Sequence, residues 1–259
     1  MLTRSASLGE IDVDAIAVKP AEVDLDIITD WSPMMLVIDF EGMEHLPTLS
    51  SIRAIAAVHE TVLTAPVRAD GFDPCGDDHL LSELQDHVSF AFVAGHPGYL
   101  RPHEQARAIA PRLRVALDRF GDGMVGTEGI ERIALATGAT QYELLSPRTH
   151  RTIRSLRHAG FAGDIAVYAP TVRSDDEDIL LDTLGAYVAR RGAVANGLSP
   201  AAKTDRTASG ETRVRLLDAI GEYALIGTNE TINDDIRRLK SVGVDTVVCY
   251  PAAGLSSLD

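Results

Sequence analysis

The sequence predicts a single α/β domain over residues 1–259, folded as a (β/α)8 TIM-type barrel. Short apolar runs alternate with stretches of helical periodicity along the chain, which is typical of strands joined by helices. Most of these runs are apolar throughout, so the strands are expected to be parallel and covered on both faces. The chain length of 259 residues is also that of one such barrel. A doubly wound open sheet is the alternative fold.

Eight apolar runs are the predicted strands, in order Ala15–Val18, Met34–Phe40, Thr61–Val67, Val88–Ala94, Thr140–Leu145, Ile165–Ala169, Tyr223–Ile226 and Thr246–Cys249. The stretches of helical periodicity that follow them are Leu46–Val58, His79–Asp86, His103–Phe120, Glu128–Thr137, Thr149–His158, Asp176–Arg191, Glu211–Ile220 and Thr231–Val242. The first connection, Glu22–Trp31, is short and predicts a helix or an irregular segment.

The last two predicted strands form the clearest unit of the pattern. The run Tyr223–Ile226 stops at a glycine, and Thr228 then suits the N-cap of an amphipathic helix. Gly243 is the expected terminator of that helix, just before the run Thr246–Cys249. Such a strand–helix–strand unit has parallel strands and a right-handed crossover. It places its loops at the carboxyl ends of the strands, where barrels carry their chemistry.

Three features depart from an ideal barrel. The connection Gly95–Ala139 is long and is expected to hold two helices, and Asn196–Gly210 is expected to be a mobile loop or lid. Only Pro251–Asp259 follow the eighth predicted strand, so the helix that normally closes the barrel is expected to be missing.

The acidic composition limits the classes of partner. The formal net charge is −14, with 38 acidic against 24 basic residues, and the only lysines are Lys19, Lys203 and Lys240. This charge repels nucleic acid and anionic membranes, so neither is an expected partner. A composition with few lysines and many acidic residues resembles that of proteins from salt-loving archaea. The alternative interpretation is an ordinary acidic cytosolic protein.

Location and redox state follow from short segments. The apolar runs are too short to span a bilayer, and residues 1–10 lack the apolar core of a signal peptide, so a cytoplasmic protein is expected. Cys249 falls in an apolar strand and Cys75 in a polar loop, which predicts no disulfide.

The ordered features of the second half resemble one known family. Residues 129–170 read GIERIALATGATQYELLSPRTHRTIRSLRHAGFAGDIAVYAP: a helix, a strand, Ser146-Pro147, an arginine-rich helix and a strand ending in Tyr-Ala-Pro. An acidic loop, a long helix, Gly227-Thr228 and the strand entry Gly243-Val244-Asp245 follow. In this order and spacing the chain is similar to the luciferase-like superfamily of TIM-barrel flavin and deazaflavin oxidoreductases, which includes monooxygenases. The resemblance covers about half of the chain, and the first half is shorter than the family norm.

The resemblance implies an oxidoreductase that uses FMN or a deazaflavin of the coenzyme F420 type on a small-molecule substrate, with a homodimer as the oligomeric expectation. It also implies cofactor contacts at Ser146 and Thr149 after the fifth predicted strand, and at Gly227 and Thr228 after the seventh. Helix N-termini with hydroxyl groups suit phosphate binding. A plain serine cap followed by proline explains Ser146 equally well.

The barrel rule selects the residues just past each strand as candidates for chemistry, namely Lys19, Asp39, Glu41, Thr64, Arg68, His96, Glu143, Ser146, Tyr168, Thr228 and Tyr250. Asp39 and Glu41 lie on one side of a strand end, which predicts an acid–base pair or a cation site; a solvated strand exit is the alternative. His96, in Gly-His-Pro-Gly, is the third catalytic candidate, with a loop-capping histidine as the alternative.

Other patterns are interpreted structurally. The segment 121–126 matches GxGxxG but follows a helix rather than a strand, so the match is interpreted as accidental. Arg148, Arg151, Arg154 and Arg157 recur every three residues and are expected to pair with acidic groups on a neighbouring helix or subunit. The eight histidines show no metal-binding spacing, so no metal site is predicted.

Two other functions stay open. One is a luciferase-like barrel that has lost its catalysis and now binds a metabolite or serves as an assembly subunit. The other is a phosphate-substrate lyase or isomerase that uses Lys19 or Glu41. A barrel mouth plugged by apolar side chains would favour the first of these; a mouth lined by the polar strand-end residues would favour an enzyme.

Overall fold

The computed structural model describes residues 11–32, 34–121 and 123–258, and it confirms the parallel α/β barrel. Eight strands form the closed ring: β1 (Ala15–Val18), β2 (Met35–Ile38), β3 (Glu60–Pro66), β4 (Ser89–Val93), β5 (Met124–Gly126), β6 (Gln141–Leu144), β7 (Ile165–Val172) and β9 (Thr246–Pro251). Pairing of β9 with β1 closes the ring. Residues 1–10, on which the prediction about a signal peptide rests, lie outside the described residues.

The identity of one ring strand differs from the sequence prediction. The predicted seventh strand, Tyr223–Ile226, is present as the two-residue β8 (Leu225–Ile226) but is not part of the ring. Thr171 of β7 pairs with Leu225 of β8 and also with Pro251 of β9, so β8 and β9 lie on opposite edges of β7. The place in the ring next to β7 therefore belongs to β9, and the eighth member is β5, which the sequence did not reveal.

β5 escapes prediction because it is short and built on glycines. A Cβ atom on Gly123 would lie 2.7 Å from the Phe92 ring, and one on Gly126 would lie 2.7 Å from Val93. Both glycines let β5 approach β4 closely, where any larger side chain would clash. Met124–Gly126 lies within the GxGxxG match, whose Asp122 is outside the described residues. The connection Gly95–Ala139 therefore holds helices, as predicted, but it also contains a ring strand that the sequence prediction did not include.

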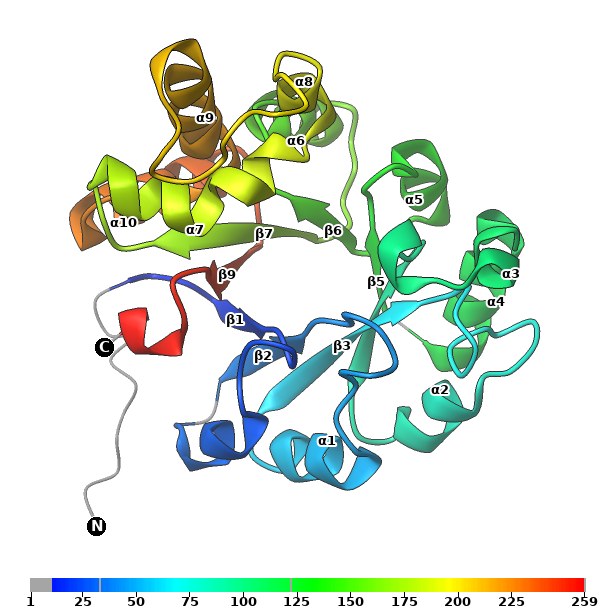
Figure 1. Ribbon diagram of the computed structural model, residues 1–259. Helices are drawn as coiled ribbons and strands as arrows, with labels where there is room; N and C mark the ends of the chain where they lie inside the picture. The colour runs from blue at the N-terminus through cyan, green and yellow to red at the C-terminus, as the bar shows by residue number, and fades with distance from the viewer. Residues whose placement is uncertain (1–10, 33, 122, 259) are drawn as a thin grey trace.

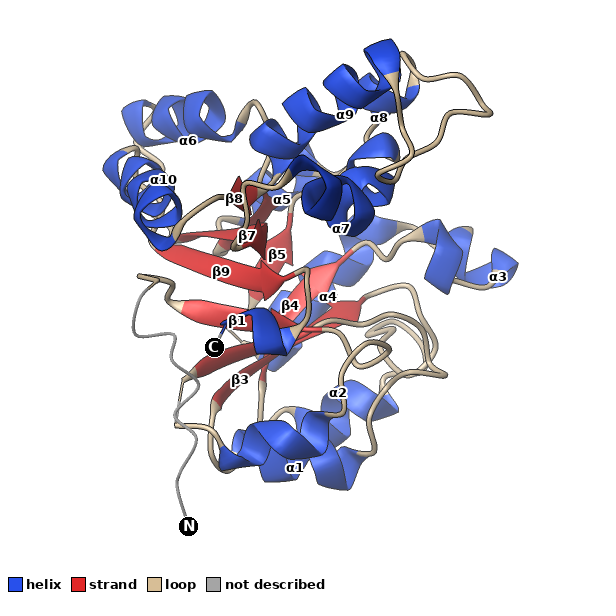
Figure 2. Cartoon of the chain, turned by 60° about the vertical axis from the view of Figure 1, so that its left-hand side comes forward, coloured by secondary structure: helices blue, strands red, loops and turns tan. Residues whose placement is uncertain are grey.

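Helices cover the outside of the ring (Figures 1 and 2). They are α1 (Leu49–Ala56), α2 (His79–Leu84), α3 (Pro102–Gln105), α4 (Ile109–Phe120), α5 (Glu131–Thr137), α6 (Thr149–His158), α7 (Glu177–Ala189), α8 (Gly192–Ala195), α9 (Gly210–Tyr223) and α10 (Asn229–Ser241). Short 3-10 turns are η2 (Leu25–Asp30), η3 (Pro97–Tyr99) and η4 (Leu255–Leu258), the last of which follows β9. As predicted, Thr228 caps α10 by accepting a hydrogen bond from the Thr231 N–H.

Alternation along the strands separates two kinds of core. Outward-facing residues such as Ile16, Leu36 and Ile38 pack against the helices. Inward-facing residues fill the barrel itself, and they are Ala15, Ala17, Val37, Val62, Ala91, Tyr142, Ala166, Tyr168, Val248 and Tyr250. Several are alanines, and three are tyrosines from β6, β7 and β9. Large rings thus occupy a barrel whose other inward side chains are mostly small.

Both cysteines lie where the sequence places them. Cys249 is buried in β9, Cys75 is exposed in a loop, and both thiols are free. Among the helices that the structure describes, none combines the length and the apolar character that crossing a membrane requires.

Candidate functional site

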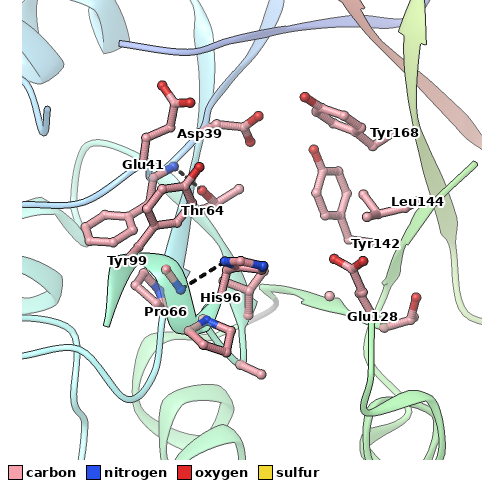
Figure 3. Close-up of a pocket in the computed structure, with 18 of the residues that line it drawn as sticks. Asp39, Glu41, Thr64, Pro66, His96, Tyr99, Glu128, Tyr142, Leu144 and Tyr168 are labelled. Atoms are coloured by element: carbon pink, nitrogen blue, oxygen red, sulfur yellow. Dashed lines mark hydrogen bonds between the residues drawn. The ribbon is translucent and has the colours of Figure 1, made fainter. Parts of the chain in front are cut away.

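A cavity of about 740 Å³ opens at the carboxyl ends of the barrel strands (Figure 3). One wall carries Asp39, Thr64 and His96, and Tyr142, Leu144 and Tyr168 face it across the cavity. The full lining is Lys19, Asp39, Phe40, Glu41, Thr64, Pro66, Val93, Ala94, Gly95, His96, Pro97, Gly98, Tyr99, Gly126, Thr127, Glu128, Tyr142, Leu144, Tyr168, Tyr187, Arg190 and Arg191. The mouth is therefore open and lined by strand-end residues, which is the arrangement expected of an enzyme rather than a plugged barrel.

Two of the three inward tyrosines, Tyr142 and Tyr168, line the cavity, and Tyr250 packs against Tyr168 outside its lining. The rings of Tyr168 and Tyr250 stack with centroids 5.8 Å apart, and Tyr142 meets Tyr168 edge-on at 6.2 Å. Burial raises the pKa of Tyr142 and of Tyr168 well above the usual value of a phenol, so both stay neutral and can donate a hydrogen bond. The Tyr250 hydroxyl donates to Glu22 Oε2 at 2.5 Å. The Tyr142 hydroxyl is buried without a hydrogen-bond partner among the described residues.

Asp39 is the most perturbed carboxyl of the cavity. Burial raises its pKa to about 7, against the lowering effects of nearby Lys19 and of a hydrogen bond from Tyr168. The charges of Glu41 and Glu22 add to the rise. A carboxyl with a pKa near neutral can both accept and donate a proton at physiological pH. Asp39 is therefore the best placed general acid–base group of the cavity.

Thr64 fixes the backbone on both sides of Asp39. Its Oγ1 accepts a hydrogen bond from the Phe40 N–H at 2.6 Å and donates to the Ile38 carbonyl oxygen at 3.4 Å. Thr64 itself is buried in the neighbouring strand, β3. The two bonds bracket the peptide of Asp39, so Thr64 holds the direction in which that carboxyl points.

Glu41 shares the strand end with Asp39, as predicted, but its surroundings differ. Lys19 Nζ lies 3.8 Å from Glu41 Oε1 and 3.7 Å from Glu22 Oε1, and it also lies over the Tyr250 ring at 4.5 Å. Glu41 Oε2 accepts a hydrogen bond from the Ala21 N–H at 3.1 Å. The structure therefore brings both predicted carboxylates to one cavity, with Glu41 in an ion pair and Asp39 beside Lys19 and Tyr168.

His96 lines the cavity from its exposed rim. Its Nδ1 accepts a hydrogen bond from the Gly98 N–H at 3.0 Å, which caps η3. The neutral ring must then carry its proton on Nε2, so it can donate to a ligand. Arg68 fixes the start of this loop through hydrogen bonds from Nε to the Ala94 oxygen and from Nη2 to the Gly95 oxygen.

The four predicted cofactor contacts lie outside the cavity lining. Thr149 is fully buried, and its Oγ1 accepts the Ser146 N–H at 3.0 Å and lies 3.1 Å from Ser146 Oγ. The Gly227 N–H donates to the Val172 and Ser174 carbonyl oxygens, and Thr228 caps α10. These groups serve local helix starts in the structure, and their role toward a cofactor stays a prediction.

The sequence interpretation missed a cluster at the end of α7. Tyr187, Arg190 and Arg191 line the cavity together with Glu128, which follows β5. Arg191 Nη1 lies 2.7 Å from Glu128 Oε1, and its guanidinium lies 4.2 Å from the centroid of the Tyr187 ring. The spacing of Tyr187 and Arg191 by four residues was a visible signal for their contact. Nothing in the sequence showed that this helix end overhangs the barrel mouth.

One group of residues has metal-ligand spacing, but its contacts explain it without a metal. The ligand atoms of Asp70, His103 and Glu104 lie within 4.8 Å of one another. Glu104 accepts the N–H groups of Asp70 and Arg101, and Asp70 forms a 2.6 Å ion pair with Arg107. The cluster ties α3 to the loop after β3, and its guanidinium groups oppose a bound cation.

Comparison with known proteins agrees with the fold. A solved structure described as an "F420-dependent secondary alcohol dehydrogenase in complex with an F420-acetone adduct" is similar with a TM-score of 0.62 and 12% sequence identity, over 96% of each chain. At that identity the similarity shows the fold alone, and it supports the resemblance to luciferase-like barrels at that level. The chain belongs to a family of unknown function, DUF7388, whose model matches residues 8–258. No curated protein matches the chain. The salt-adapted origin inferred from composition stays a prediction.

Proposed function

We propose that the protein is an oxidoreductase that interconverts a hydroxyl and a carbonyl group of a small molecule with a deazaflavin or flavin as redox partner. The observation that carries this proposal is Asp39, a carboxyl with a pKa of about 7 in an open cavity at the barrel mouth. Oxidation of an alcohol must remove a proton from oxygen as the hydride leaves carbon, and Asp39 can take that proton. The similarity of the fold to an F420-dependent dehydrogenase supports the choice of cofactor class.

The lining fits a flat polar ring. A cavity of about 740 Å³ is within the size range of small-molecule sites, and Leu144 and Pro66 offer apolar surface on its two walls. The buried Tyr142 hydroxyl has no partner among the described residues, and it would donate to a carbonyl oxygen or ring nitrogen of such a ligand. When bound, the cofactor would supply the ring atom that accepts or returns a hydride, a carbon in a deazaflavin and a nitrogen in a flavin.

The residues of the chain divide the remaining work. Asp39 accepts the hydroxyl proton during oxidation and returns it to the carbonyl oxygen during reduction. The neutral Tyr168 hydroxyl donates to Asp39 and orients its carboxyl group. His96 donates from Nε2 at the rim, where it can bind an oxygen of the substrate. Lys19 limits the rise in the pKa of Asp39, which keeps that carboxyl able to ionise near neutral pH.

Titration of the purified protein with coenzyme F420 and, separately, with FMN tests the proposal. Binding should quench cofactor fluorescence and saturate at one cofactor per chain, for one cofactor in preference to the other. A matched Tyr142→Phe variant should bind that cofactor more weakly, because it lacks the hydroxyl that faces the ring. Absence of saturable binding by both cofactors would overturn the redox assignment, whereas equal binding by the wild type and Tyr142→Phe would overturn only the proposed contact.

A further inference from the structure

A second polar part of the cavity carries guanidinium groups instead of the Asp39 carboxyl. Arg190 and Arg191 lie just after α7 and line the cavity beside Tyr187. These two guanidinium groups stand out in a chain with 24 basic and 38 acidic residues. An overall charge of −14 repels anions at long range, so an anionic ligand needs local cations at its binding site.

Arg191 is held in place before any ligand arrives. Its guanidinium lies 4.2 Å from the centroid of the Tyr187 ring and 5.8 Å from that of Tyr223. Only 18% of its side chain is exposed, whereas its partner Glu128 is 63% exposed. The Nε atom of Arg191 is buried and has no hydrogen-bond partner among the described residues. The pair therefore holds the guanidinium beside the cavity while using only one of its N–H-bearing nitrogens.

Arg190 supplies charge that no acid in the described chain neutralises. It is exposed, lines the same cavity and has no ion pair among residues 11–32, 34–121 and 123–258. Lys19, at the Asp39 end, is by contrast shared between Glu22 and Glu41. The free positive charge of the cavity thus lies at the α7 end, and the proton-transfer group lies at the other end.

We infer that Arg190 and Arg191 bind an oxyanion of the substrate, a carboxylate or a phosphate, so that the substrate is a small acid whose hydroxyl or carbonyl group extends toward Asp39. This inference rests on the proposed function for the role of Asp39. The anion site itself depends only on the α7 cluster. Guanidinium groups suit carboxylate and phosphate because their N–H donors match both oxygens of either group.

Binding of small probes to the protein without cofactor tests the anion site. The probes are glycolate, its neutral counterpart ethylene glycol, and inorganic phosphate, titrated by calorimetry at constant ionic strength. Glycolate or phosphate should bind about tenfold more tightly than ethylene glycol, since one charge-assisted contact contributes about 1.4 kcal/mol. Arg190→Gln should remove that preference. Glu128→Gln should strengthen oxyanion binding, because the competing carboxylate is gone.

Arg154→Gln is the matched control, since Arg154 is exposed on α6 and outside the cavity. It changes the net charge as Arg190→Gln does and should leave probe binding unchanged. Equal affinities for glycolate, phosphate and ethylene glycol would overturn the anion site. The anion site would also be overturned if Glu128→Gln lost as much oxyanion binding as Arg190→Gln. Both changes would then act by disturbing the local fold at the end of α7.

A second arm separates the substrate from the cofactor as the source of the oxyanion. The affinity for coenzyme F420 is measured in Arg190→Gln and in wild type. Unchanged cofactor affinity with lost glycolate binding supports a substrate site. A parallel loss of both would assign the site to a cofactor phosphate and overturn the substrate inference. If no cofactor binds to either protein while glycolate still depends on Arg190, the proposed redox function fails and the anion site stands.

Discussion

The two walls of the cavity carry different chemistry. The ends of β1 to β4 contribute basic and acidic side chains, namely Lys19, Asp39 and His96. The ends of β6, β7 and β9 contribute phenols that stay neutral, because burial raises the pKa of Tyr142 and Tyr168. The two walls also interact. Loss of hydration by burial is the main cause of the high pKa of Asp39, and a hydrogen bond from Tyr168 on the phenol wall limits that rise.

Asp39 and Glu41 repeat the contrast within a single strand end. They are two residues apart and both line the cavity, so the strand points them to the same side. Glu41 is close to a lysine and a backbone N–H group, whereas Asp39 meets Tyr168 and the barrel interior. Their neighbours rather than their direction therefore distinguish the two carboxylates: Glu41 balances the charge of Lys19, and the proposed proton transfer falls to Asp39.

Replacing Asp39 should have the largest effect. Asp39→Asn keeps the shape of the side chain but cannot accept a proton, so kcat should fall by about 10²- to 10⁴-fold, the usual contribution of a general acid or base. Steady-state kinetics with the identified substrate measures the loss. Glu41→Gln should cost far less, because that carboxylate only balances Lys19. Equal losses of kcat in the two variants would remove the distinction between a proton-transferring Asp39 and a charge-balancing Glu41.

The stability of the protein should depend on pH through Asp39. Its pKa is about 7 in the folded state against 3.8 for an ordinary aspartate, so between these values the folded state holds a proton that the unfolded chain has released. The free energy of unfolding should therefore decrease as pH rises from about 4 to 7, by up to about 4 kcal/mol, and then level off. Asp39→Asn should lack this decrease and gain stability relative to wild type as pH rises.

Urea unfolding of both proteins between pH 4 and 8, at constant salt, measures this dependence. The difference between the two proteins isolates Asp39, because other perturbed carboxyls, such as Glu143 with a pKa of about 7, are present in both. A difference in unfolding free energy that stays constant over this range would mean that Asp39 ionises normally. The proton-transfer role would then lose its physical basis.

The same contrast shows what the sequence could reveal. Apolar runs and the barrel rule located Asp39, Glu41 and His96 at one mouth, because strand ends of a parallel barrel converge on one face. They could not rank the two carboxylates, since the surroundings of each depend on side chains from distant strands. Tyr142 lies one residue before Glu143, which the barrel rule selected, and alternation along β6 points Tyr142 inward. Only the closed ring shows that it meets Tyr168.

The errors have identifiable causes as well. β5 is three residues long and depends on close approach between glycines and β4, which leaves no apolar run to detect. β8 has the apolar pattern of a barrel strand but pairs only with the end of β7. The α7 cluster depends on a helix end reaching over the mouth, a tertiary contact without local signal. The helix starts at Ser146 and Thr228 could be predicted because helix caps depend on neighbouring residues alone. The same local pattern could not show that both residues lie outside the cavity lining.

Removing the hydroxyl that fixes Asp39 should have a smaller effect than removing its carboxyl. Thr64→Val keeps the side-chain volume but loses the bonds to the Phe40 N–H and the Ile38 oxygen. We expect a loss of about 1–2 kcal/mol in stability, because the Phe40 N–H is left buried without its partner. We also expect kcat to fall about tenfold with KM nearly unchanged, since a misdirected base weakens the transition state more than binding.

Thr64→Ser supplies the control, because it restores the hydroxyl without the methyl group. It should recover most of kcat and keep the pH dependence of the wild type. If Thr64→Ser is as slow as Thr64→Val while its stability is restored, the methyl group rather than the hydrogen bonds matters, and Thr64 does not position Asp39.

Among these variants, Tyr142→Phe is expected to have the smallest effect on stability. The Tyr142 hydroxyl is buried without a partner among the described residues, so Tyr142→Phe removes a desolvated polar group and leaves none unpaired. The free energy of unfolding should stay within about 1 kcal/mol of wild type or rise, whereas removal of a used hydroxyl costs stability. Tyr250→Phe is the comparison, since its hydroxyl donates to Glu22 at 2.5 Å and its loss should destabilise the protein. Thermal and urea unfolding of both variants would measure the difference. A Tyr142→Phe protein less stable than Tyr250→Phe would show that the Tyr142 hydroxyl already has a structural role and is not held in reserve for a ligand.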